Sequence, residues 1–199
     1  MRSTSFIVLL AAVAGVYAQC SSLGTGASDS ATEFTLSAFN PATSVTSPLH
    51  LVSVVTIPHT SFHVLSTQAA TINWLGFTMT SGIITAIPPN GETAAVASLG
   101  NINPDPSNIS PPAGPWPTWS NTLAPPSELF CSVPNPSGGD AILALHDRTD
   151  LFFLCPSFFS SGVDPVAIVY NASSSVFPDA FSYDGASCQP VTLLLVPSS

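Results

Sequence analysis

Short apolar runs separated by turn residues constrain the fold of this chain more than any other feature. Residues 49–57, 83–87 and 191–196 are rich in Val, Ile and Leu, and residues 33–38 alternate polar and apolar side chains. Such alternation is typical of a half-buried strand, and helical periodicity is nearly absent after the first 18 residues. About ten to eleven runs of this kind predict an all-β fold, either a single antiparallel β-sandwich or a barrel.

An internal similarity leaves a second topology open. Residues 34–65 and residues 130–154 each contain a Phe, then an Asn-Pro pair, an apolar run and a second run that contains Phe. A three-strand unit used twice would be typical of pseudo-symmetric β folds. We therefore keep a β-trefoil-like fold with pseudo-repeats as the alternative.

The first 18 residues have the pattern of a secretory signal peptide. Arg2 supplies a positive charge, residues 6–13 are apolar, and Val16-Tyr17-Ala18 fits a small-residue cleavage site. Cleavage after Ala18 would leave residues 19–199, a length that suits one domain. The later apolar runs are too short to cross a bilayer. We therefore expect one secreted, extracellular β domain that does not associate with a membrane.

Residues 100–128 differ from the rest in being rich in proline. Proline fixes φ and removes a backbone donor, so we expect a long surface excursion without regular structure. Trp116 and Trp119 lie in this span, and aromatic rings held on a stiff loop can stack on sugar rings at little entropic cost. These two residues are the predicted ligand-binding side chains, although they can also fold back over the core.

The charge balance excludes some partners. The chain has a net charge of −9 and no lysine, and Arg2 leaves with the signal peptide, so Arg148 is the single basic residue of the secreted part. An acidic surface repels phosphate backbones and anionic lipids, so we expect no nucleic-acid partner and no membrane partner.

Four cysteines in an exported chain predict two disulfides. Three pairings are open, and we favour Cys131 with Cys155 and Cys20 with Cys188, because the first pair brackets the apolar runs around residue 148 and the second ties the two ends together. The chain has no C-x-x-C pair, so we expect no zinc site. His59 and His63 are four residues apart, but Pro58 and a strand-like pattern argue against the helix that would align them on a metal.

The polar segment 146–150 joins two apolar runs and predicts a tight loop. His146 and Asp147 could orient a general base, but the chain has no G-x-S-x-G nucleophile motif. We therefore interpret Asp147, Arg148 and Asp150 as a structural loop in which Arg148 pairs with one of the two aspartates. No catalytic residue, metal ligand or cofactor is predicted. Asn108 and Asn171 begin N-x-S sequons and are candidate glycosylation sites.

Several patches together resemble a family of small secreted proteins of filamentous, especially basidiomycete, fungi. They lie at residues 34–38, 62–66, 150–155, 169–173 and 183–193. The resemblance implies an extracellular setting and a β-rich domain, and it implies no activity.

Three functions follow as hypotheses. The first is a non-catalytic extracellular or cell-surface protein that binds cell-wall polysaccharide through its loop aromatics. The second is a secreted hydrolase of carbohydrate that uses carboxylates brought together from several turns. The third is a purely structural or interaction protein with an acidic, glycosylated surface.

Overall fold

The computed structural model describes residues 20–56, 60–68, 74, 76–88, 93–100, 116–120, 129–159, 165–173 and 181–198. The predicted signal peptide lies outside these residues. Within them the chain forms strands and two short 3₁₀-helices, Ser21–Leu23 and Gly185–Ser187, and no α-helix. No helix in this described part is long and apolar enough to span a bilayer. The all-β prediction is therefore confirmed.

The described residues form fourteen strands, and most of these coincide with the apolar runs. They are β1 (Ala31–Asn40), β2 (Val45–Pro48), β3 (His50–Thr56), β4 (Thr60–Ser66), β5 (Gly76–Thr80), β6 (Ile83–Ile87), β7 (Ala95–Gly100), β8 (Trp116–Ser120), β9 (Phe130–Val133), β10 (Ala141–Leu145), β11 (Phe152–Phe159), β12 (Val166–Tyr170), β13 (Phe181–Tyr183) and β14 (Gln189–Pro197).

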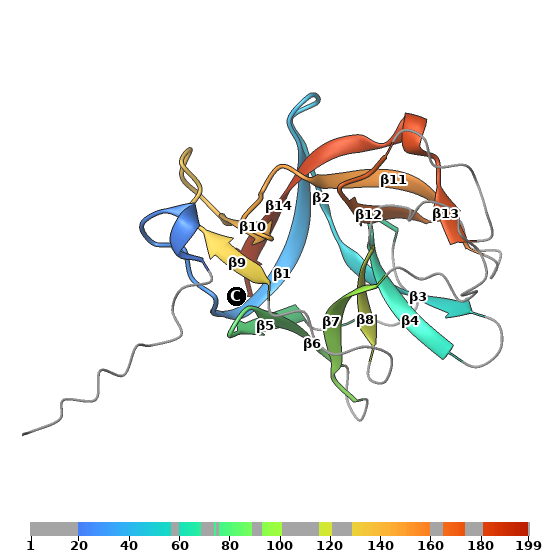
Figure 1. The fold of residues 1–199 in the computed structure, drawn as a ribbon, viewed down its shortest axis with the longest axis horizontal. Coiled ribbons are helices and arrows are strands. Elements are labelled where there is room, and N and C mark those ends of the chain that lie inside the picture. The colour runs from blue at the N-terminus through green and yellow to red at the C-terminus, as the bar shows by residue number, and fades with distance from the viewer. Residues whose placement is uncertain are drawn as a thin grey trace, which may run out of the picture.

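Nine of the strands close into an antiparallel barrel. The ring runs β11-β12-β4-β8-β7-β6-β5-β1-β14 and closes where β14 pairs with β11 (Figure 1). The strands β2, β3, β9, β10 and β13 pair with members of the ring or with each other outside this path. Of the two predicted architectures, the chain adopts the barrel.

The strand pairing differs between the two segments that suggested a repeat. In the first segment β1 pairs with β2, and β3 pairs with β4 along its whole length. In the second segment β9 pairs with β10, but β11 takes β12, β13 and β14 as its partners. The likeness is therefore limited to the first hairpin of each segment, and the trefoil-like repeat is not seen in the pairing.

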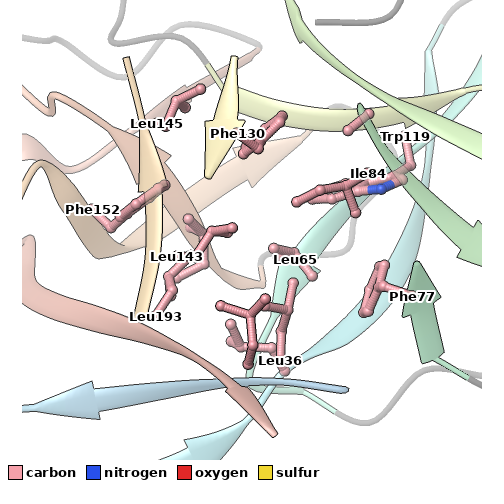
Figure 2. Close-up of a cluster of buried hydrophobic side chains, with 14 of the residues drawn as sticks. Leu36, Leu65, Phe77, Ile84, Trp119, Phe130, Leu143, Leu145, Phe152 and Leu193 are labelled. Atoms are coloured by element: carbon pink, nitrogen blue, oxygen red, sulfur yellow. The ribbon is translucent and has the colours of Figure 1, made fainter. Parts of the chain in front are cut away.

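The core fills the inside of the barrel because successive side chains of a strand point to opposite faces. In β14 the buried residues are Val191, Leu193 and Leu195, with less buried residues between them. Figure 2 shows side chains from several strands, including Leu36, Phe77, Phe130 and Phe152, gathered in one cluster. Burial of this apolar surface, worth about 25 cal/mol per Å² removed from water, is the main stabilising term.

The disulfide pairing is not the one that we favoured. The bonds join Cys20 to Cys131 and Cys155 to Cys188. Cys131 lies in β9, and the segment after Cys20 runs along this strand through reciprocal hydrogen bonds between Ser28 and Ser132. Cys155 lies in β11, which pairs with the start of β14 next to Cys188. The barrel topology, rather than proximity in the sequence, sets both partners.

The expectation of a wholly irregular excursion at residues 100–128 is wrong for its central part. β8 lies inside this span and pairs with β7 over five positions and with β4 over His63↔Trp119 and Val64↔Thr118. Pro117 lies opposite Leu99 of β7, and the ladder to β4 begins one residue later at Thr118, so the missing N–H of Pro117 removes no donor from that second ladder. Residues 101–115 and 121–128 lie outside the described residues.

Candidate functional site

A cleft of about 290 Å³ opens where β2 and β5 separate from each other along β1. β1 pairs with β2 over residues 37–40 and with β5 through Ala31 and Phe34. Residues 35 and 36 lie between these two ladders, and they contribute Thr35 and Leu36 to the wall. The other lining residues are Pro48, Leu49, His50, Leu51, Trp74, Gly76 and Phe77. The cleft therefore forms because the long strand β1 pairs with β5 near its start and with β2 near its end.

Backbone bonds hold the walls of the cleft in place. The Leu49 amide donates a hydrogen bond to the carbonyl oxygen of Leu36 at 2.9 Å, which fixes the passage from β2 to β3 against β1. On the opposite wall, Gly76 has a φ of +149°, and a Cβ there would lie 2.9 Å from the carbonyl oxygen of Phe34. This close approach of β5 to β1 is compatible only with glycine.

Aromatic side chains dominate the cleft. The Trp74 side chain is partly buried, and its ring packs edge-on against the His63 ring with a centroid distance of 5.1 Å. Phe77 is almost fully buried and lies 5.7 Å from the Trp119 ring, so the floor of the cleft continues into the core. The indole Nε1 of Trp74 is buried without a hydrogen-bond partner.

The described cleft has few polar side chains. Thr35 is exposed, and its hydroxyl donates to the carbonyl oxygen of Val196 at 3.4 Å. His50 is partly exposed, as its alternation within a strand predicts. Among the described residues that line the cleft, none is Asp or Glu. Glycoside hydrolysis generally needs a pair of carboxyl groups, and the described lining does not supply them.

The predicted aromatic site is wrong for Trp119. Its side chain is fully buried in the main core cluster, because it points inward from a barrel strand that the proline-rich composition concealed. Trp119 therefore cannot stack on an external ligand. Trp116 begins the same strand, and its side chain lies outside the described features. Trp74 is partly buried, packs against the main core cluster and lines the cleft, so it is the tryptophan that a ligand in the cleft would contact.

The segment at residues 146–150 forms the tight loop that the sequence predicted. His146 and Asp147 have φ values of 49° and 60°, and Leu145 and Arg148 exchange two backbone hydrogen bonds across them. Positive φ at both central residues is typical of a type I′ turn. His146 is exposed at the tip of this turn.

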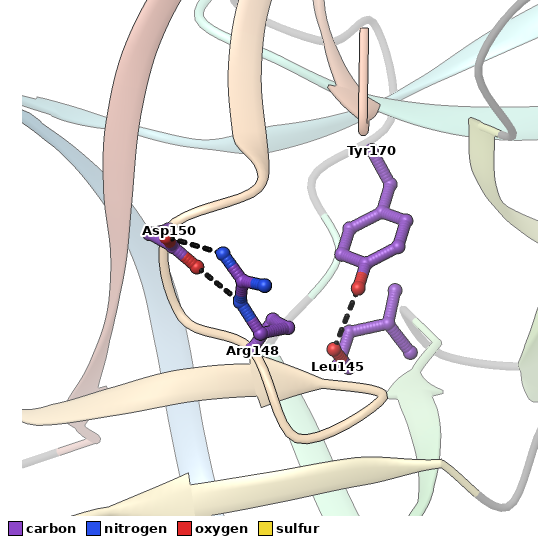
Figure 3. Close-up of polar contacts among 4 residues, drawn as sticks. All are labelled: Leu145, Arg148, Asp150 and Tyr170. Atoms are coloured by element: carbon purple, nitrogen blue, oxygen red, sulfur yellow. Dashed lines mark hydrogen bonds and ion pairs between the residues drawn. The ribbon is translucent and has the colours of Figure 1, made fainter.

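Arg148 selects Asp150 as its partner rather than Asp147. The Arg148 Nε and Nη2 atoms donate to the two carboxylate oxygens of Asp150 at 2.8 and 2.7 Å (Figure 3). The hydrogen bonds from Arg148 lower the pKa of Asp150, and the bond to Asp150 in turn raises the pKa of Arg148. Both side chains are more than half exposed, so the pair orders the loop and contributes little to stability.

The remaining predicted residues are dispersed. His59 lies outside the described residues, and within the described part no three His, Cys, Asp or Glu side chains come together as a metal site. Asn171 is exposed at the end of β12, whereas Asn108 lies outside the described residues. The cleft was not predicted from the sequence. Its position depends on where β2 and β5 pair along β1, and no local sequence pattern indicates that.

Comparison with known proteins finds no matching family model, no matching curated protein and no matching solved structure.

Proposed function

We propose that the chain is an exported, non-catalytic binding protein whose cleft holds one sugar unit of an extracellular polysaccharide. The observation that carries this proposal is the cleft of about 290 Å³ with Trp74 and Phe77 in its wall and no carboxylate among its described lining residues. Ligand pockets typically begin at about 300 Å³, so this volume suits a single ring rather than a long segment.

The chemistry of the lining supports a sugar as the ligand. A sugar ring has apolar C–H faces and polar edges. The apolar faces can pack on the indole of Trp74, and the hydroxyl groups can bond to the polar groups at the opening, Thr35 and His50. The described lining contains no Asp, Glu, Lys or Arg side chain, which agrees with a neutral ligand.

Export is the second part of this proposal. Two disulfides are typical of proteins outside the cytosol. Cleavage after Ala18 and a glycan on Asn171 complete the proposed mature form, with Asn108 as a second acceptor. N-terminal sequencing of the protein from the culture medium should begin at Gln19. Treatment with an N-glycosidase should lower its mass, and this shift should become smaller in an Asn171→Gln variant.

Sedimentation with insoluble polysaccharides tests the binding. The wild-type protein should sediment with at least one of chitin, β-glucan and cellulose. Trp74→Ala should weaken retention by a factor of about five, because a ring contact is worth about 1 kcal/mol. Phe158→Ala is the matched control, since Phe158 is an exposed aromatic residue that is not part of the lining.

Two results would contradict the proposal. The first is a wild-type protein that sediments with none of the three polymers. The second is a folded Trp74→Ala variant, with an unchanged circular dichroism spectrum, that is retained as well as the wild type.

A further inference from the structure

The Cys155–Cys188 disulfide continues the ladder that closes the barrel. β11 and β14 pair in the antiparallel register Phe152↔Val191, Phe153↔Pro190 and Leu154↔Gln189. The next position of this register places Cys155 opposite Cys188, and these two residues form a disulfide with a Cα–Cα distance of 4.2 Å. Directly opposed, non-hydrogen-bonded residues of antiparallel strands lie about 4.5 Å apart. The disulfide is therefore a covalent cross-link at the fourth position of the ladder between β11 and β14. We call this ladder the seam of the barrel.

The backbone bonding of this seam is sparse. The ladder between β11 and β14 has three paired positions. The ladder between β14 and its other ring neighbour, β1, has six paired positions. The disulfide therefore supplies a large part of the connection between β11 and β14.

The two disulfides differ in their accessibility to a reagent. Cys20 and Cys131 are both buried, with 5% and 1% of their surface exposed. Cys155 is also fully buried, but Cys188 is partly exposed and follows the exposed residues Ala186 and Ser187. Thiol–disulfide exchange requires a thiolate to reach one sulfur, so exchange should begin at Cys188.

We propose that the Cys155–Cys188 disulfide is a reducible latch on the barrel seam, which a dithiol reductant opens while the Cys20–Cys131 bond stays intact. A thiolate of the reductant attacks Cys188 Sγ, the sulfur–sulfur bond breaks, and Cys155 leaves and takes up a proton. The second thiol of the reductant then displaces Cys188 from the mixed disulfide. The reductant ends as a disulfide, and the protein gains two thiols.

Opening the latch changes the surface as well as the covalent structure. Phe152 and Val191 face each other across the seam and belong to the main core cluster, with 0% and 3% of their surface exposed. Once the disulfide is reduced, Phe152 and Val191 are held together by the three paired positions of the β11–β14 ladder. If β11 and β14 move apart, apolar core surface becomes exposed at this edge of the barrel. This conformational response to reduction does not depend on a ligand in the cleft.

Alkylation under native conditions tests the proposal. The folded protein is treated with limiting dithiothreitol, free thiols are trapped with iodoacetamide, and the alkylated cysteines are identified by mass spectrometry over time. Cys155 and Cys188 should be alkylated at least about tenfold faster than Cys20 and Cys131, because exchange rates follow access to the sulfur. Equal rates, faster release of Cys20 and Cys131, or no alkylation before global unfolding would each overturn the proposal.

Hydrogen exchange separates the latch from a general loss of stability. In a Cys155→Ser/Cys188→Ser variant, faster exchange should be confined to residues 152–155 and 181–191. In the matched Cys20→Ser/Cys131→Ser variant, faster exchange should appear at residues 20–28 and in β9 instead. Exchange that rises uniformly over the barrel in the first variant would show that the bond is a general staple rather than a latch.

Discussion

The hydroxyl of Tyr170 donates a hydrogen bond to the carbonyl oxygen of Leu145 at 2.8 Å (Figure 3). This bond joins the last residue of β12 to the last residue of β10, which are not neighbours in the sheet. The Tyr170 ring also packs edge-on against Phe152 at a centroid distance of 5.4 Å. One side chain therefore links the hairpin tip at residues 146–147 to the barrel.

Replacement of Tyr170 by Phe tests this link. The variant keeps the ring contact but leaves the Leu145 carbonyl without this donor, so the free energy of unfolding should fall by about 1 kcal/mol. Urea denaturation at neutral pH measures the change. An unchanged midpoint would show that water replaces the hydroxyl at no cost.

The same variant should change the response to alkaline pH. Burial raises the pKa of Tyr170 above its ordinary value. A tyrosine in the unfolded chain ionises near pH 10, so the wild type loses stability from about pH 10 up to the raised pKa. Tyr170→Phe lacks this component. The stabilities of the two proteins should therefore converge above pH 10, and parallel curves would contradict the assignment.

Trp119 should be among the residues whose truncation costs most stability. Trp119→Ala removes a fully buried ring and should lower the free energy of unfolding by about 3–5 kcal/mol. Trp119→Phe should cost much less, because it keeps an aromatic ring and removes an indole N–H that is buried without a partner. Phe158→Ala, at a residue that is 37% exposed, is the surface control. Chemical denaturation of the three variants checks this order, and a mild Trp119→Ala variant would contradict the buried position.

The two disulfides should stabilise the fold unequally. Their sequence separations are 111 and 33 residues. The loop-entropy relation then gives about 4.8 kcal/mol for Cys20–Cys131 and about 3.7 kcal/mol for Cys155–Cys188. Removal of each pair as a double Ser variant, followed by thermal unfolding, should therefore show the larger loss for the first pair. The reverse order would indicate that the Cys155–Cys188 disulfide stabilises the folded protein by more than the loss of chain entropy in the unfolded state accounts for.

Gly76 should tolerate no side chain. Gly76→Ala places a Cβ against the carbonyl oxygen of Phe34 at a positive φ, and the cost should be about 1–3 kcal/mol. Gly138→Ala is the matched control, because Gly138 also has a positive φ but has no atom within 4 Å of the added Cβ. The difference between the two unfolding free energies isolates the clash between β5 and β1, and equal costs would show that the backbone conformation alone matters.

Local pattern predicted most of the strands but missed two of them. The strands β3 and β6 match the predicted runs at residues 49–57 and 83–87 closely, because turn residues bound each of them. β2 has four residues, and β8 contains Pro117, so neither carries a clear alternation. Both segments form strands because they pair with neighbouring strands, β2 with β1 and β8 with β4 and β7. This pairing is a property of the assembled sheet and not of the local sequence.

The candidate site was predicted less well than the fold. Trp119 is buried in the core and is not available to a ligand, since the sequence shows that a segment is rich in proline but not which face of a distant strand it meets. The pairing of Arg148 within its own loop was predicted, because both partners lie two residues apart.

The sequence by itself determined the all-β class, the turn at residues 146–147 and the presence of two disulfides, since periodicity, turn chemistry and cysteine count act over a few residues or over the whole composition. Tertiary structure alone decided which cysteines pair, which tryptophan is buried and where the cleft opens. Each of these depends on how the ring of strands closes, and that closure joins residues such as Cys20 and Cys131 that are 111 positions apart.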